Sequence, residues 1–291
     1  MGDQAVKRDF ISFQKRVKKE IMTHRVIVNN EFTRWFAIGE ATLDDVRYFT
    51  MQFSVFSNLF ILAQMKKVLN SATVEEMHAA KEILLNELGV VFKRKTKEDE
   101  ESLNKRLRDK ENEGDPAIVN TEGTIDGGTF RFRAAHFEWL LDFAKPLNLG
   151  FSDIGKRKHG SVSTLHFTDA LERIYGSDDF TTAAGASYAI ENWAAAGFWK
   201  ELVAGLKKFK DREKIDLPLS FFTWHDKVED QHAAHTKDEL AEVFYYEDFD
   251  EDHFIEAGKL MLDACAVFWD GLNEARLRQG QGSSNCTSSR A

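Results

Sequence analysis

Proline is almost absent from this chain, and its absence limits the possible folds more than any other feature. The 291 residues contain only Pro116, Pro146 and Pro218. Proline breaks the interior of a helix because it lacks an amide proton and its ring clashes with the preceding turn. Long proline-free stretches therefore leave room for long helices. We predict an all-α protein, a bundle of about seven core helices around one hydrophobic core.

The apolar residues recur with helical spacing. Phe49, Phe53, Phe56 and Phe60 follow one another at steps of four, three and four, which places them on one buried face of a helix over 43–70. The other expected helices cover 6–38 with a break near Asn29 and Asn30, 73–88, 133–147, 161–175, 180–209 capped by Asp178 or Asp179, a segment after Pro218, and 251–277.

One segment interrupts the helical pattern. Residues 93–115 are almost entirely charged, and the stretch that follows contains the pair Gly127 and Gly128 with alternating aromatic residues near Phe130. This pattern predicts a short hairpin. We therefore interpret 90–132 as an insertion within a single helical domain, 1–277, followed by a disordered polar tail, 278–291.

Charge and cysteine content narrow the function. The net charge is −9 with no basic stripe, so nucleic-acid binding has little support. Cys265 and Cys286 are the only cysteines, which favours a reducing compartment over a disulfide framework. The N-terminus lacks the apolar core of a signal peptide, and no apolar stretch is long enough to span a membrane. We expect a cytoplasmic protein that acts on a small molecule, away from membranes.

The most informative motif lies in the segment after Pro218. His225, Glu229 and His232 stand at positions i, i+4 and i+7, which places them within an arc of roughly 60° on one helix face. Imidazole and carboxylate groups together suit iron, manganese or zinc better than magnesium or calcium. The alternative is a solvated helix face that carries the same residues without a metal.

Three further residues have the right chemistry. Glu191 lies among apolar and small residues, so if it is buried it must be paired, protonated or metal-bound. Glu87 and His136 are also flanked by apolar residues at helical spacing. Each has an ordinary structural alternative: a solvent-facing edge for Glu191, a helix-end carboxylate for Glu87 and a core histidine for His136.

Taken in order, Glu87, His136, Glu191 and the motif His225-x-x-x-Glu229-x-x-His232 resemble the heme oxygenase-like diiron oxidases and oxygenases. These are relatives of the helical thiaminase-II and pyrroloquinoline-quinone-synthase fold. The resemblance spans about residues 10–275. It implies three carboxylates and three histidines that hold two iron ions, Fe2+ or Fe3+, with O2 as co-substrate. Two departures stand out: the family more often has Asp where Glu229 stands, and 48 residues separate Glu87 from His136, so the ends of the insertion must meet.

The resemblance also implies an activity. Family members carry out N-oxygenation, desaturation or oxidative C–C cleavage on amino-acid-like or fatty-acid-like substrates, in proteins that commonly form homodimers. Tyr188, one turn before Glu191, becomes a candidate catalytic residue that hydrogen-bonds or relays electrons. A packing role is its ordinary alternative.

Other functions remain open on the sequence alone. Glu229-x-x-His232 and Glu75-x-x-His78 also match the E-x-x-H pattern of ferritin-like diiron bundles, with Glu191 and either Glu31 or Glu40 as partners. A metal-free enzyme of the pyrroloquinoline-quinone-synthase or thiaminase type is a second possibility, and the thiaminase type needs a cysteine nucleophile. A binding protein is a third. Further ligand sets could include His159, His166 or His235.

Overall fold

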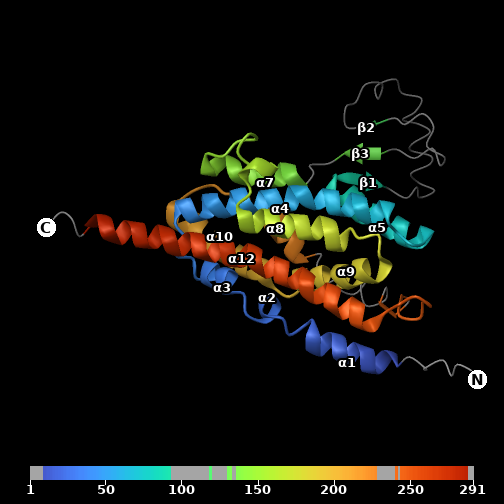
Figure 1. Cartoon of the computed structure of the whole chain (residues 1–291). Coiled ribbons are helices and arrows are strands. Elements are labelled where there is room, and N and C mark those ends of the chain that lie inside the picture. The colour runs from blue at the N-terminus through green and yellow to red at the C-terminus, as the bar shows by residue number, and fades with distance from the viewer. Residues whose placement is uncertain are drawn as a thin grey trace, which may run out of the picture.

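The described part of the chain is mainly helical. The computed structural model describes residues 9–92, 118–119, 130–132, 136–227, 240–241 and 243–287. The long helix α12 (Glu251–Thr287) runs the length of the molecule and packs against α9 (Phe180–Ala194) and α8 (Val162–Ala170) (Figure 1). The remaining elements are α1 (Phe10–Glu20), α2 (Arg25–Val28), α3 (Glu31–Ile38), α4 (Leu43–Leu69), α5 (Val74–Glu87), β1 (Val90–Phe92), β2 (Ile118–Val119), β3 (Phe130–Phe132), α7 (His136–Ala144), η2 (Lys145–Leu147), η3 (Arg157–His159), η4 (Leu171–Tyr175), α10 (Phe198–Glu213) and the helical segment 220–227.

Capping residues fix where two of the central helices begin. The Thr42 side chain accepts a hydrogen bond from the Asp45 amide, and the Asp45 carboxylate accepts one from the Thr42 amide, which forms a capping box ahead of α4. At α9 the Asp179 carboxylate accepts from the Thr182 amide. The predicted starts of both helices are confirmed.

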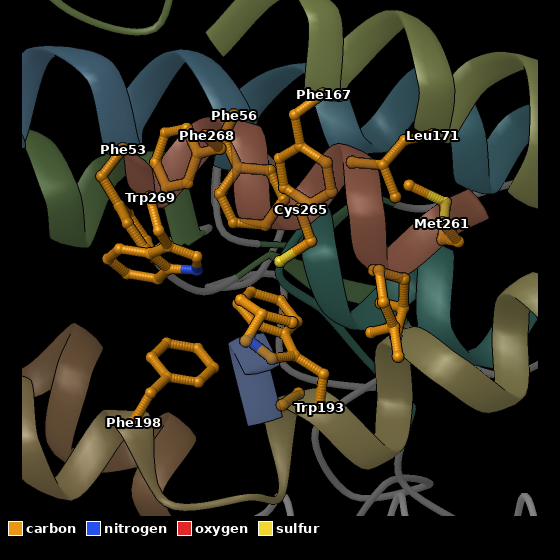
Figure 2. Close-up of a cluster of buried hydrophobic side chains, with 14 of the residues drawn as sticks. Phe53, Phe56, Phe167, Leu171, Trp193, Phe198, Met261, Cys265, Phe268 and Trp269 are labelled. Atoms are coloured by element: carbon orange, nitrogen blue, oxygen red, sulfur yellow. The ribbon is translucent and has the colours of Figure 1, made fainter. Parts of the chain in front are cut away.

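The phenylalanines of α4 form the centre of the core. Phe49, Phe53 and Phe56 are buried, and Phe60 is partly buried against the same cluster. Figure 2 shows Phe53 and Phe56 beside Phe167 and Phe268, in a region where aromatic rings from several helices meet. The buried face predicted from the four-three-four spacing is confirmed.

The predicted helix 180–209 is wrong as a single element. It is two helices, because α9 ends at Ala194 and α10 begins at Phe198. The break falls at Gly197, whose φ of +100° lies in the left-handed region that residues with a Cβ rarely adopt. The chain turns there, so Trp193 and Trp199 approach the same cavity from two different helices.

The insertion contributes a small sheet. The strand order is β1-β3-β2, with both pairs antiparallel. Val90 pairs with Phe132, and Ile118 pairs with Arg131. The ends of the segment 90–132 therefore meet, as the separation of Glu87 from His136 requires. The predicted strand signal near Phe130 is confirmed, and the charged stretch 93–115 lies outside the described residues.

The C-terminal helix is longer than the sequence suggests. The expected helix ends at Leu277, whereas α12 continues to Thr287, into the segment 278–291 that the polar composition predicts to be disordered. No proline occurs after Leu277. Extending an existing helix requires no new nucleus, so a polar segment can continue it at little cost. Among the described residues, no helix is long and apolar enough to cross a membrane.

The contact between α9 and α12 depends on a small residue. A Cβ built on Gly185 would lie 2.3 Å from the carbonyl oxygen of Phe254 and 3.2 Å from the Cβ of Ala257. Gly258 lies on the facing side of α12, where its added Cβ would approach the Gly185 carbonyl oxygen. The two backbones can come this close only because Gly185 has no side chain.

We expect Gly185→Ala to destabilise the protein by about 1–3 kcal/mol, because the added methyl group meets backbone atoms that cannot rotate away. Thermal unfolding followed by circular dichroism measures the effect. Gly150→Ala is the matched control, since its added Cβ would meet only Asp153 Oδ2 at 3.5 Å. Equal melting temperatures for the two variants would show that the α9–α12 contact tolerates a wider spacing.

Candidate metal site

Two of the predicted ligands lie at the ends of helices on either side of the insertion. Glu87 is the last residue of α5, and His136 is the first residue of α7. Their side chains meet, with His136 Nδ1 2.8 Å from Glu87 Oε2. The pairing of β1 with β3 places these helix ends together. Val90, which follows Glu87 in the sequence, pairs with Phe132, which precedes His136.

His225 is held in place by its own helical segment and by aromatic rings. Its Nδ1 lies 2.7 Å from the Phe221 carbonyl oxygen, which is an acceptor, so Nδ1 carries a proton and donates it. In neutral imidazole this places the lone pair on Nε2, the form in which histidine binds metals. The Trp199 ring stacks on the imidazole with centroids 4.5 Å apart and planes 21° apart.

Glu87, His136 and His225 form a group. One donor atom from each lies within 4.8 Å of the other two, and the rings of the two histidines lie 4.8 Å apart. Donor atoms bound about 2.1 Å from one ion lie about 3–4 Å from one another, so a small inward movement would complete a site. His136 is 5% exposed and His225 is 8% exposed, which keeps water from competing for the ligands. The donor set therefore fits a divalent transition metal.

Glu191 faces the same cavity from α9. It is 8% exposed, and it lines the cavity together with Glu87, His136 and His225. The cavity measures about 730 Å3 including its opening to solvent. The burial predicted for Glu191 is confirmed, and four of the six predicted ligands come together here from four different segments. The rest of the described wall is apolar or aromatic apart from Ser57.

The other predicted residues have different outcomes. Glu229 and His232 lie outside the described residues, as does His235. Tyr188 is buried, but its ring packs against Phe254 of α12 with centroids 5.8 Å apart, and it is not among the described residues that line the cavity. Burial raises the pKa of the Tyr188 hydroxyl. The structure does not bring Tyr188 together with the four ligands.

The ferritin-like scheme is not supported by the described residues. Glu75 and His78 are exposed on α5, and Glu31 and Glu40 are exposed at or near α3, so none of them reaches the cavity that Glu191 lines. An acidic residue near the start of a helix is favoured by the helix dipole alone, which explains Glu75.

The remaining alternative residues also lie elsewhere. His166 is exposed on α8, and exposed His159 hydrogen-bonds through Nε2 to the Ser152 carbonyl oxygen. Cys265 is fully buried among aromatic rings, between Phe167 and Trp193 (Figure 2). Burial raises the pKa of its thiol, which opposes the thiolate form needed for nucleophilic attack. A thiaminase-type role for Cys265 is therefore not supported.

Sequence reasoning missed the aromatic wall. Trp199 stacks on His225, and the Trp224 ring lies 4.8 Å from that of His136. Trp139 stacks on His136 from the next turn of α7, with centroids 5.6 Å apart. The adjacency of Trp224 to His225 was visible in the sequence. The role of Trp199 was hidden, because it depends on the helix break at Gly197.

Comparison with known proteins identifies the fold. No protein-family model and no curated protein matches this sequence. The chain is similar to a domain of unknown function with a heme oxygenase-like fold from Shewanella denitrificans, with a TM-score of 0.57 and 14% identity over 94% of this chain and 96% of that one. The chain has a heme oxygenase-like fold.

Two other solved structures have the same fold. A TenA homologue from Pseudomonas syringae matches with a TM-score of 0.59 and 10% identity, over 90% of this chain and 93% of that chain. A CADD-like protein of unknown function from Nostoc punctiforme matches with a TM-score of 0.56 and 16% identity, over 93% and 96%. The heme oxygenase-like fold predicted from the order of the site residues is confirmed. Identities this low establish architecture and leave the activity to be argued from the site.

We expect Glu87→Gln to weaken Co2+ binding by roughly 100-fold, because it removes an anionic ligand from a buried site. Co2+ absorbance titrations of the apo protein measure the affinity, and Co2+ is a coloured substitute for other divalent metals. Glu75→Gln is the matched control, a neutralised glutamate at the exposed start of the same helix. A larger loss of Co2+ affinity for Glu75→Gln than for Glu87→Gln would indicate that the metal binds at the other end of α5.

Proposed function

We propose that this protein is a non-heme diiron oxidase or oxygenase that uses O2 to oxidise a small substrate. The observation that carries the proposal is the convergence of Glu87, His136, Glu191 and His225 on one buried cavity. Two carboxylates and two histidines that line one cavity form a mixed donor set for divalent transition-metal ions. A pair of such ions would be held by the charge of the two carboxylates.

Iron fits the donor set better than the other common metals. Two histidines and one carboxylate hold either non-heme iron or catalytic zinc, and magnesium prefers oxygen alone. A second carboxylate in the same cavity favours the two-iron arrangement of carboxylate-bridged helical proteins. Glu87, His136 and His225 would hold one ion. Glu191, with Glu229 and His232 of the predicted motif, would complete the second. Bound ferrous iron would supply the electrons that reduce O2.

The surrounding residues prepare the site for that chemistry. The Phe221 carbonyl keeps the proton of His225 on Nδ1. This fixes the tautomer and leaves the lone pair of Nε2 available to bind a metal. Trp199 and Trp224 restrict the orientation of the imidazole rings. The aromatic wall makes the surroundings of the ligands less polar than water, which strengthens the electrostatic interactions inside the cavity.

The cavity wall also bears on the substrate. Phe53, Phe56, Phe60, Ile83 and Ile190 present hydrocarbon to the cavity, and no lysine or arginine is among the described lining residues. A substrate with a small apolar body fits this wall. Among the reactions of the resembling family, desaturation and oxidative C–C cleavage of a fatty-acid-like substrate fit better than reactions of a highly charged amino acid.

Anaerobic titration of the apo protein with ferrous iron, followed by mixing with O2 in a stopped-flow spectrometer, tests the proposal. We expect saturation at about two irons per chain, as in other diiron carboxylate proteins, and a transient visible band after mixing. His225→Ala should abolish the band, because it removes a ligand whose position the helix and Trp199 fix.

His166→Ala is the matched control, a histidine removed from the exposed face of α8. It should bind iron and react as the unmodified protein does. A folded protein that binds no iron would contradict the proposal and favour a metal-free enzyme of the same fold. Equal loss of the band in both variants would mean that His225 is not a specific ligand.

A further inference from the structure

Three of the six tryptophans of the chain, Trp199, Trp269 and Trp35, lie on one line of aromatic rings that leads away from the candidate metal site. The line begins at His225, whose ring stacks on Trp199 at 4.5 Å. Trp199 contacts Phe198 at 4.5 Å, and Phe198 contacts Trp269 at 5.6 Å. The line comes from α10 and α12 and crosses the core, where Figure 2 shows the Phe198 ring below Trp269 in the same cluster.

The line continues to the surface through α3. Trp269 contacts Phe32 at 5.7 Å, and Phe32 contacts Trp35 at 5.5 Å. Trp35 is half-buried, and the Arg276 guanidinium lies 4.3 Å from the centre of its ring. No centroid-to-centroid step from His225 to Trp35 exceeds 5.7 Å.

We propose that Trp35, Trp269 and Trp199 form an electron relay that connects the protein surface with the candidate metal site. Tryptophan is among the side chains most readily oxidised by one electron, and the phenylalanines between the three fill the gaps without being oxidised. The relay rests on the proposed function for its inner end, since it needs an oxidised site to receive electrons. Electron transfer along the rings themselves depends only on the aromatic residues and needs no metal.

The transfer balances as four single-electron steps. Trp199 gives one electron to the oxidised site and becomes a radical cation, Trp269 then reduces Trp199, and Trp35 reduces Trp269. A dissolved one-electron reductant such as ascorbate finally reduces Trp35. The net result is that one electron passes from ascorbate to the site, and every tryptophan returns to its starting state.

The surroundings of the inner tryptophans favour transfer of the positive charge to the next ring over its retention on one ring. The indole N–H group of Trp199 is buried and has no hydrogen-bond acceptor among the described residues. An oxidised indole there cannot readily lose its proton, so it stays a strong oxidant and takes an electron from the next ring. At the outer end the charge of Arg276 opposes a second positive charge on Trp35, which makes oxidised Trp35 a ready acceptor from ascorbate.

Two oxidisable side chains lie beside the line. Trp193 stacks on Phe198 with centroids 4.5 Å apart, but it is buried, so a dissolved reductant does not reach it. Figure 2 shows Cys265 in the same cluster. Its thiol is fully buried, and burial disfavours the thiolate that would be oxidised easily. Electrons are therefore supplied from the surface end.

Photo-oxidation of the metal-free protein tests the relay apart from the iron proposal. An excited ruthenium polypyridyl complex with a persulfate quencher removes electrons at the surface, and peptide mass spectrometry then locates oxidised tryptophan. In the unmodified chain we expect oxidation products at buried Trp199, which is 6% exposed, as well as at Trp35. In Trp269→Phe the product at Trp199 should fall to background, while the product at Trp35 persists.

Two further variants make the result decisive. Tyr245→Phe is the control, because Tyr245 is an exposed, oxidisable ring that contacts Phe244 and stands off the line, and it should leave the Trp199 product unchanged. Trp35→Phe changes a half-buried ring, so it keeps the fold even if Trp269→Phe does not, and it should lower the product at Trp199. A Trp199 product that is equal in Trp269→Phe, Trp35→Phe and the unmodified chain would overturn the relay, as would oxidation confined to Trp35.

The iron-loaded protein supplies the second readout. After reaction with O2 in the absence of substrate, ascorbate should re-reduce the iron several-fold more slowly in Trp269→Phe than in Tyr245→Phe, at the same iron content. Equal rates would overturn the relay. Failure of the chain to bind iron would contradict the proposed function and leave the photo-oxidation result to decide whether the aromatic line conducts.

Discussion

The pairing of β1 with β3 is the contact on which the candidate site depends. Three backbone pairs, from Val90–Phe132 to Phe92–Phe130, close the long segment between α5 and α7. The entropic cost of closing a loop rises only slowly with loop length, so a short strand ladder can hold the two ends of a long insertion together. Glu87 and His136 lie just beyond the ladder, and their 2.8 Å contact follows from it.

The aromatic core has two consequences for the site. It fixes the backbone of α4, α9, α10 and α12 at a density that leaves few voids, so Glu191 on α9 and Trp199 on α10 are held rigidly. It also surrounds the ligands with hydrocarbon, where charge–charge interactions are screened less than in water. A cation bound between Glu87 and Glu191 would therefore be held strongly.

The fold and the function rest on different observations. Solved structures with 10–16% identity match nearly the whole length of the chain, which fixes the heme oxygenase-like architecture. One fold can support many chemistries, and the name of this one does not imply that heme is bound. The proposed use of iron rests instead on the donor atoms of Glu87, His136 and His225, which meet within 4.8 Å in a buried cavity.

The sequence by itself determined the helices and the types of residue at the site. Helical periodicity is a local property, so the Phe49–Phe60 face and most helix starts could be predicted from neighbouring residues. Resemblance to a known family supplied the order of the ligands, and four of them do meet. Only the tertiary structure decided which acids are buried. Glu87 and Glu75 stand on one helix, and the long-range β1–β3 pairing carries Glu87 alone to His136. The break at Gly197 and the line of rings from Trp199 to Trp35 were equally hidden, because they join segments that only packing brings together.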